Sequence, residues 1–117
     1  MKLFEARTWL RNNKNQQAFA GNRFLNNTDS LQFVENLYAN GAVVVLIDNI
    51  FKERWRIKEC SGPYADTLIV QLPEDEAQRG KLLEIFHEDN ELEPQFKEEL
   101  VNKGRDVARA RIMFWWD

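Results

Sequence analysis

Two short apolar runs constrain the fold of this 117-residue chain more than any other feature. The stretches AVVVLIDNI at 42–50 and TLIVQL at 67–72 are rich in β-branched residues, and turn-forming residues stand near their ends. Such runs are typical of strands in the interior of a sheet. Neither run approaches the ~18 residues of a membrane-spanning helix. The sequence therefore predicts that residues 1–117 form a single domain organised around a β-sheet.

Two segments have the spacing of helices that would cover this sheet. In TDSLQFVENLYANG, at 28–41, apolar residues recur every three or four positions, the opening Thr-Asp pair can cap the first turn, and Gly41 can end the helix. In EDEAQRGKLLEIFHEDN, at 74–90, acidic residues occupy the first turn, where they suit the helix dipole, and an apolar side follows. A shorter helix is expected at 94–103.

Three further stretches alternate polar and apolar residues, as strands with one buried face do. They cover residues 2–10, 51–58 and 108–116, the second of them as an extension of the preceding strand or as a hairpin arm. Strand, helix, strand, strand, helix, strand is the split βαβ order of the ferredoxin-like fold. We therefore expect an α+β fold of that kind. Its four-stranded antiparallel sheet would have the order 4-1-3-2, with the helices on one face and the last strand beside the first.

The C-terminal stretch ARIMFWWD is unusual, because chain ends tend to fray and to carry small or polar residues. In the expected strand, alternation directs Trp116 into the core and Trp115 to the opposite face. On that face the first strand would place Trp9 next to Trp115. The residues that would gather there have the composition of binding hot spots, and we predict that they bind a partner protein: Trp9, Trp115, Met113, Arg7 and Arg111.

Other interpretations of this face are open at this stage. The Asn- and Gln-rich loop at 11–25, which has two Phe residues and a Leu as possible anchors, is long enough to cover it, and so is the segment 51–64. RNA binding by stacked bases is not expected, because no RNP1 pattern occurs. Self-association through the last strand is a further alternative, although Arg109 and Arg111 oppose simple edge pairing.

A second candidate site lies at the start of the first long helix. The stretch GNRFLNNTDS brings Arg23, with Asn22 beside it, to a helix N-terminus, where free backbone N–H groups favour anions. Acylphosphatases share the expected strand order and hold phosphate with an Arg in this loop, but only Gly21 and Arg23 match their signature. The alternative function is therefore an enzyme or sensor that binds a small anion. A surface ion pair or a loop clamp is the structural explanation of Arg23.

Residue counts and motifs argue against the common catalytic classes. The only cysteine, Cys60, is expected to be a buried filler, and the only histidine, His87, is expected on the solvent side of its helix. No CxxC, HExxH, GxSxG or glycine-rich phosphate loop is present, so we expect no enzyme activity, no cofactor and no metal. The single thiol and the lack of a spanning segment favour a cytoplasmic protein without a membrane partner. The net charge of −3 gives no support for nucleic-acid binding.

Three stretches, GPYADTLIVQLPED, FVENLYANGA and the terminal FWWD, resemble a family of small bacterial proteins. The resemblance extends from GNRF to the end of the chain, and the long GPYADTLIV-x-LP stretch makes it specific at the level of a family. That family carries no known activity, so the resemblance implies neither a reaction nor site residues.

Overall fold

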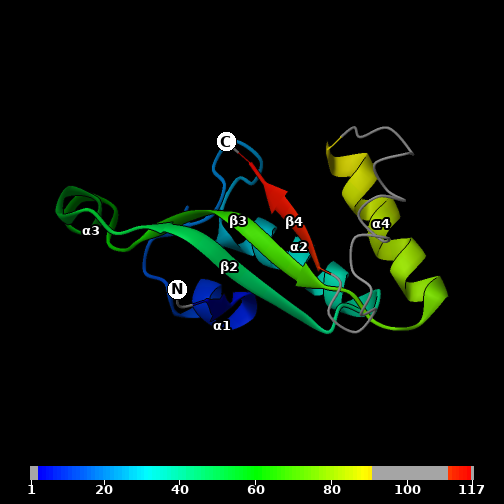
Figure 1. The fold of residues 1–117 in the computed structure, drawn as a ribbon. Coiled ribbons are helices and arrows are strands. Elements are labelled where there is room, and N and C mark those ends of the chain that lie inside the picture. Colours follow the sequence, from blue (N-terminus) through cyan, green and yellow to red (C-terminus); the bar gives the residue numbers. More distant parts are fainter. Residues whose placement is uncertain (1–2, 91–110, 117) are drawn as a thin grey trace.

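The computed structural model describes residues 3–90 and 111–116, and within these ranges it has four strands and four helices (Figure 1). They are β1 (Phe4–Glu5), α1 (Ala6–Asn12), α2 (Asn27–Ala39), β2 (Val44–Phe51), α3 (Arg54–Cys60), β3 (Tyr64–Gln71), α4 (Glu76–Asn90) and β4 (Arg111–Trp115). The strands form one antiparallel sheet in the order β1-β2-β3-β4. The predicted α+β class and four-stranded antiparallel sheet are confirmed. No helix in the described ranges has the length and apolar character needed to cross a bilayer.

One face of the sheet carries the hydrophobic core. Its register aligns two rows of buried side chains across β2, β3 and β4, namely Val45–Val70–Ile112 and Ile47–Leu68–Phe114. Helices α1, α2 and α4 add buried residues to the same core, among them Leu10, Leu37 and Phe86. These three helices therefore pack on one side of the sheet, as predicted for α2 and α4, whereas α3 contributes no buried residue.

The first predicted strand is mostly a helix. β1 has two residues and α1 follows it directly, so the strand expected at 2–10 is wrong. The Glu5 carboxylate caps the helix, because it accepts hydrogen bonds from two backbone N–H groups of the first turn at 2.9 and 3.1 Å. Ala6 and Leu10, whose spacing suits either structure, are buried one helical turn apart.

This change at the N-terminus alters the strand order. A single helix between β1 and β2 would leave them parallel, but α1 and α2 both lie between them, so the chain returns antiparallel to β1. β2 then pairs with β1 directly, through Phe4–Ile47 and Glu5–Leu46. The last strand, β4, pairs with β3 instead. The expected order 4-1-3-2 is therefore wrong, and β1 and β4 stand at opposite ends of the observed order.

The hairpin of β2 and β3 ends in a helix, although the sequence predicts a continuing strand at 51–58. Asn49, whose φ is +54°, interrupts the pairing of β2 with β3, and pairing resumes at Ile50–Ala65 in the same register. The strand ends at Phe51, and α3 lies at the tip of the hairpin, apart from the other helices (Figure 1). Cys60, expected to be buried, is half-buried at the end of α3. A seven-residue helix is too short for its period to stand out against alternation.

The other described elements agree with the sequence prediction. Helices α2 and α4 and strand β3 lie where they are expected, and Gly41, with φ of +102°, follows the end of α2. The cap of α2 is Asn26, whose side chain accepts the N–H of Asp29, instead of Thr28 or Asp29. The helix expected at 94–103 and the first three residues of the expected last strand lie outside the described residues.

The loop between α1 and α2 is joined to the end of the sheet. Backbone hydrogen bonds of 2.8 and 2.9 Å connect residues 18–20 to Ala65, so the loop runs beside β3 where β4 has ended. Of its three expected anchors, Phe19 and Phe24 are buried, but Leu25 is 74% exposed. The two buried rings pack against the indole of Trp116 in the core, at centroid distances of 5.6 and 5.1 Å. This contact holds the C-terminal end of β4 in place.

Candidate functional site

The sheet face opposite the core, which we name the outer face, presents three rows of side chains. Across β2, β3 and β4 they are Val44–Gln71–Arg111, Leu46–Ile69–Met113 and Asp48–Thr67–Trp115. Met113 and Trp115 are each 55% exposed, whereas Trp116 is buried. The predicted division of the last strand, with Trp116 in the core and Trp115 on the opposite face, is therefore confirmed. Arg111 is exposed on the same face of β4.

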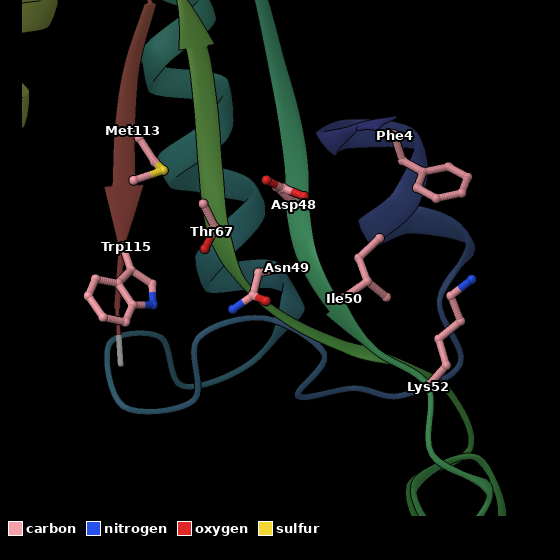
Figure 2. Close-up of a pocket in the computed structure, with 8 residues that line it drawn as sticks. All are labelled: Phe4, Asp48, Asn49, Ile50, Lys52, Thr67, Met113 and Trp115. Carbon is pink, nitrogen blue, oxygen red and sulfur yellow. The ribbon is translucent and has the colours of Figure 1, made fainter. Parts of the chain in front are cut away.

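The outer face is hollowed around its third row. The hollow has a volume of about 600 Å³ and is lined by Phe4, Asp48, Asn49, Ile50, Lys52, Thr67, Met113 and Trp115. In Figure 2 the two β4 side chains form one side of it, and Phe4 lies on the other side with residues from the end of β2. Its lining combines a large indole, a thioether and groups of both charges, which can hold a ligand in one orientation.

The polar floor of the hollow is fixed by a buried carboxylate. Asp66, which is 6% exposed, accepts hydrogen bonds at its Oδ1 from Asn49 Nδ2 at 2.8 Å and from Thr67 Oγ1 at 2.9 Å. Asp48 differs, because its carboxylate makes no hydrogen bond or ion pair with any described residue. The hollow therefore contains one carboxylate that is free to bind a donor or a cation.

The structure does not bring Trp9 and Arg7 to the outer face, so this part of the predicted cluster is wrong. Both residues lie on α1, which follows β1, at the opposite end of the strand order from β4. Trp9 is half-buried and lines a second hollow, of about 530 Å³, between α1 and the turn at 61–63. Phe4 borders both hollows.

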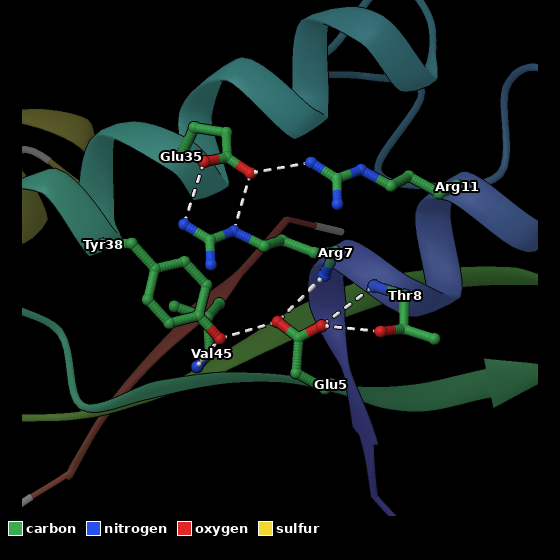
Figure 3. A network of polar contacts seen from close by, with 7 residues as sticks. All are labelled: Glu5, Arg7, Thr8, Arg11, Glu35, Tyr38 and Val45. Atoms are coloured by element: carbon green, nitrogen blue, oxygen red, sulfur yellow. Dashed lines mark hydrogen bonds and ion pairs between the residues drawn. The ribbon is translucent and has the colours of Figure 1, made fainter.

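Arg7 belongs instead to a polar network that attaches α1 to α2 and β2 (Figure 3). Its guanidinium donates two hydrogen bonds to Glu35, at 2.6 and 2.9 Å, and lies 3.8 Å from the centroid of the Tyr38 ring. The Tyr38 hydroxyl donates to Glu5 at 2.6 Å and accepts the backbone N–H of Val45 at 3.0 Å. Arg7 is thus occupied by contacts within the fold.

The charges of this network are set by burial and hydrogen bonding together. Burial raises the pKa of Glu5, but hydrogen bonds from the Tyr38 hydroxyl and from the first turn of α1 outweigh it, so the pKa lies below its ordinary value. The pKa of Tyr38 is raised, first by burial and second by its hydrogen bond to the Glu5 carboxylate. Glu5 is therefore ionised and Tyr38 protonated at neutral pH.

At the second predicted site, which comprises Arg23 and Asn22, the Arg23 side chain makes contacts within the fold. Both residues are exposed in the loop before α2, but Arg23 Nε donates to Asp89 Oδ1 at 2.9 Å, and the guanidinium lies 4.7 Å from the Phe24 ring centroid. Asp89 also accepts a hydrogen bond from the indole N–H of Trp116 at 2.7 Å. The ion-pair and loop-clamp explanation of Arg23 fits this geometry better than an anion site.

The remaining titratable residues do not assemble a reactive centre in the part of the chain that is described. His87 is half-buried instead of lying on the solvent side of α4, and its Nδ1 is buried without a hydrogen-bond partner there. Within the same ranges, no group of three or more His, Cys, Asp or Glu residues stands close enough to hold a metal ion.

Sequence reasoning missed the polar part of the hollow. Asp48 and Asn49 interrupt the apolar run VLIDNI with two turn-forming residues, and such residues tolerate the positive φ that Asn49 adopts. Phe4 could not be assigned to the hollow without the pairing of β1 with β2. Met113 and Trp115 were predicted correctly to lie on the outer face, because alternation along a single strand is enough to assign their side.

Comparisons with other proteins do not extend this description. Searches against protein-family models, curated proteins and solved structures gave no match.

Proposed function

We propose that this chain is a non-catalytic binding protein that takes up a segment of another protein on its outer face. The observation that carries the proposal is the pair Met113 and Trp115, each 55% exposed beside a hollow of about 600 Å³. Trp is among the residues most enriched at binding hot spots, and its indole gains most when a partner removes it from water. The single, half-buried Cys60 suits a protein that works in the cytoplasm.

The two exposed side chains stand on a firmly held strand. Phe114 and Trp116, which flank Trp115, are both buried, and the backbone N–H of Trp116 donates to the Asp66 carbonyl at 3.1 Å. Anchoring both neighbours restricts the strand before any partner arrives. A pre-ordered surface loses less conformational entropy on binding, which favours affinity.

The chemistry of the outer face suits a protein segment of mixed character. Its middle row, Leu46–Ile69–Met113, can contact apolar side chains of the partner. The free Asp48 carboxylate lies in the row of Trp115, so a Lys or Arg of the partner would find a counter-charge and an aromatic ring together. Arg111, at the other end of the face, can pair with an acid. An apolar centre with charges at its rim is the usual composition of a protein interface.

Selection from a random peptide library displayed on phage tests this proposal. The immobilised full chain is the target, and the affinities of selected peptides are then measured on the wild type, Trp115→Ala and Trp55→Ala. Trp55 is a matched control, because it is 52% exposed but lies on α3.

We expect Trp115→Ala to weaken the selected peptides by about tenfold or more, which is the range of interface hot spots, and Trp55→Ala to leave them unchanged. Asp48→Asn should weaken those peptides that carry a Lys or Arg. If no peptide is selected, or if the selected peptides bind Trp115→Ala as well as the wild type, the outer face is not the binding site.

A further inference from the structure

Helix α3 lies at the far tip of the β2–β3 hairpin (Figure 1). It exposes apolar and basic side chains there. Trp55 is 52% exposed and Ile57 is 44% exposed, and no residue of α3 is buried. The core gains almost nothing from these two side chains. Their exposure on a protruding element therefore calls for an explanation other than the stability of the fold.

The tip is built around one arginine that faces inward. Arg56 Nε pairs with Glu53 at 2.7 Å, and its guanidinium lies 4.5 Å from the Trp55 ring centroid and 5.2 Å from that of Tyr64. Ser61, with φ of +72°, is the C-cap of the helix. Because a seven-residue helix is marginal alone, these contacts are what hold it in one conformation.

The side chains that point away from the hairpin form one continuous surface. At roughly 100° per residue, Arg56 and Cys60 share one side of the helix, and both are half-buried. The opposite arc, of roughly 160°, carries four exposed residues in the order Ile57, Arg54, Lys58, Trp55. We name these four residues the tip surface.

The charge of the tip is positive, in contrast to the net charge of −3 of the whole chain. Arg54 and Lys58 make no ion pair with a described residue, and Lys52, next to the helix, is also exposed and unpaired there. Residues 52–60 contain two acids, Glu53 and Glu59. Glu53 is neutralised by Arg56, and their hydrogen bond lowers the pKa of the Glu53 carboxyl, so Glu59 is the one acid there without a described ion pair. An anionic partner would therefore be attracted to this end of the molecule.

We propose that the tip surface binds the surface of an anionic lipid bilayer, with Trp55 and Ile57 entering the interface and Arg54 and Lys58 contacting lipid phosphates. Trp prefers the membrane–water interface, and Lys and Arg extend their charged ends to headgroups while their stems stay in apolar surroundings. The helix lies at the projecting end of the hairpin, where it can reach a lipid layer before the rest of the molecule does (Figure 1). Ile57 favours lipid over nucleic acid, because an aliphatic side chain has no stacking partner among bases.

This inference departs from the sequence expectation that the chain has no membrane partner. That expectation rested on the lack of a spanning segment, but a helix that lies on a bilayer needs none. The proposal is independent of the outer face, which lies on other elements, so either can fail without the other.

Co-sedimentation of the full chain with vesicles tests the proposal. The probes are vesicles of phosphatidylcholine mixed with phosphatidylserine, vesicles of phosphatidylcholine alone, and a single-stranded DNA oligonucleotide as a competing polyanion. The variants are Trp55→Ala, the pair Arg54→Gln with Lys58→Gln, and the control Trp115→Ala, whose side chain is 55% exposed on β4.

We expect the wild type to bind the anionic vesicles and to be released by salt. The double charge variant should bind about 25-fold more weakly, at about fivefold per cation, and Trp55→Ala should bind on the order of tenfold more weakly. Trp115→Ala should bind as the wild type does. Lipids brominated near the headgroup should quench the fluorescence of the wild type more than that of Trp55→Phe.

Several results would overturn the proposal. The first two are an absence of vesicle binding by the wild type and equal binding of the wild type to neutral and anionic vesicles. The third is a loss of vesicle binding in Trp115→Ala as large as the loss in Trp55→Ala. The fourth is that the oligonucleotide displaces the protein from the vesicles and binds it more tightly than lipid does. Since the substituted side chains are exposed, all variants should keep the circular dichroism spectrum of the wild type. If Trp55→Ala alone loses that spectrum, the charge variant and the quenching measurement decide.

Discussion

The carboxylate of Asp89 should be the most important single polar group for the stability of the described fold. Its side chain is 6% exposed and accepts two hydrogen bonds, from the indole N–H of Trp116 at 2.7 Å and from Arg23 Nε at 2.9 Å. It thereby joins α4, the C-terminal end of β4 and the loop before α2. Asp89→Ala removes both bonds and leaves a buried indole N–H without its acceptor.

The size of the loss follows from the exposure of the two donors. A hydrogen bond to a buried charged group contributes about 1.5–3 kcal/mol, and the Trp116 bond belongs to this class. The Arg23 side chain is 41% exposed, so its ion pair contributes about 1 kcal/mol or less. We therefore expect Asp89→Ala to lower the free energy of unfolding by about 3 kcal/mol, a large part of the 5–15 kcal/mol typical of a domain.

Urea unfolding followed by circular dichroism measures this loss, and a double-mutant cycle assigns it. Trp116→Phe keeps an aromatic ring in the core but removes the indole N–H, so Asp89→Ala and Trp116→Phe should be coupled by about 2 kcal/mol. Glu88→Ala is the control, because Glu88 is exposed one position earlier on α4, and it should change stability by less than about 0.5 kcal/mol. A cost for Asp89→Ala below about 1 kcal/mol, together with no coupling to Trp116→Phe, would refute the reasoning.

Three further predictions concern the network, two glycines and the loop arginine. The pKa of Glu5 is lowered from 4.5 in the folded state, so the stabilisation by its carboxylate is present above that value and is lost as the pH falls through the folded pKa. The difference in unfolding free energy between the wild type and Glu5→Gln should therefore shrink on acidification below about pH 4.5 and should not grow. Gly41→Ala should destabilise the protein by about 2 kcal/mol in urea unfolding, because φ is +102° and the new Cβ would lie 2.6 Å from Gln78 Cδ. Gly80→Ala should instead stabilise it by about 0.5–1 kcal/mol, because Gly80 lies within α4 and the new Cβ would meet open space. Phosphate should not raise the melting temperature of the wild type more than that of Arg23→Ala, and a phosphate effect that Arg23→Ala abolishes would restore the anion-site interpretation.

The sequence predicted those elements whose signal is local. The stripe of α2 and the β-branched run of β3 were sufficient to place both, and alternation along β4 assigned Trp115 and Trp116 to opposite faces. The segment after β1 was harder to predict from the sequence, because the spacing of Ala6 and Leu10 is compatible with one face of a strand and with a helical turn. The cap that decides for the helix is Glu5, and glutamate is not a residue from which a cap is usually predicted.

The strand order could not be read from local patterns, since it depends on how many helices separate β1 from β2. That one error explains why the predicted cluster separated into two parts. Met113, Trp115 and Arg111 share one strand face, and their grouping needed only the period of two. Placing Trp9 and Arg7 in the same cluster required that β1 be the neighbour of β4, but the neighbour of β4 is β3.

The alternation of β4 connects the stability of the fold to its proposed function. Trp116 packs edge-on against Phe19 and Phe24 and donates a hydrogen bond to Asp89, and these contacts fix the backbone at the end of β4. The same backbone carries Trp115 outward, so each contact that holds Trp116 also limits the positions that Trp115 can take. The C-terminal end of β4 thus becomes a rigid support for an exposed indole. It follows that Asp89→Ala should weaken binding at the outer face although Asp89 lies on the core side, and that this loss should exceed the effect of Glu88→Ala on the same selected peptides.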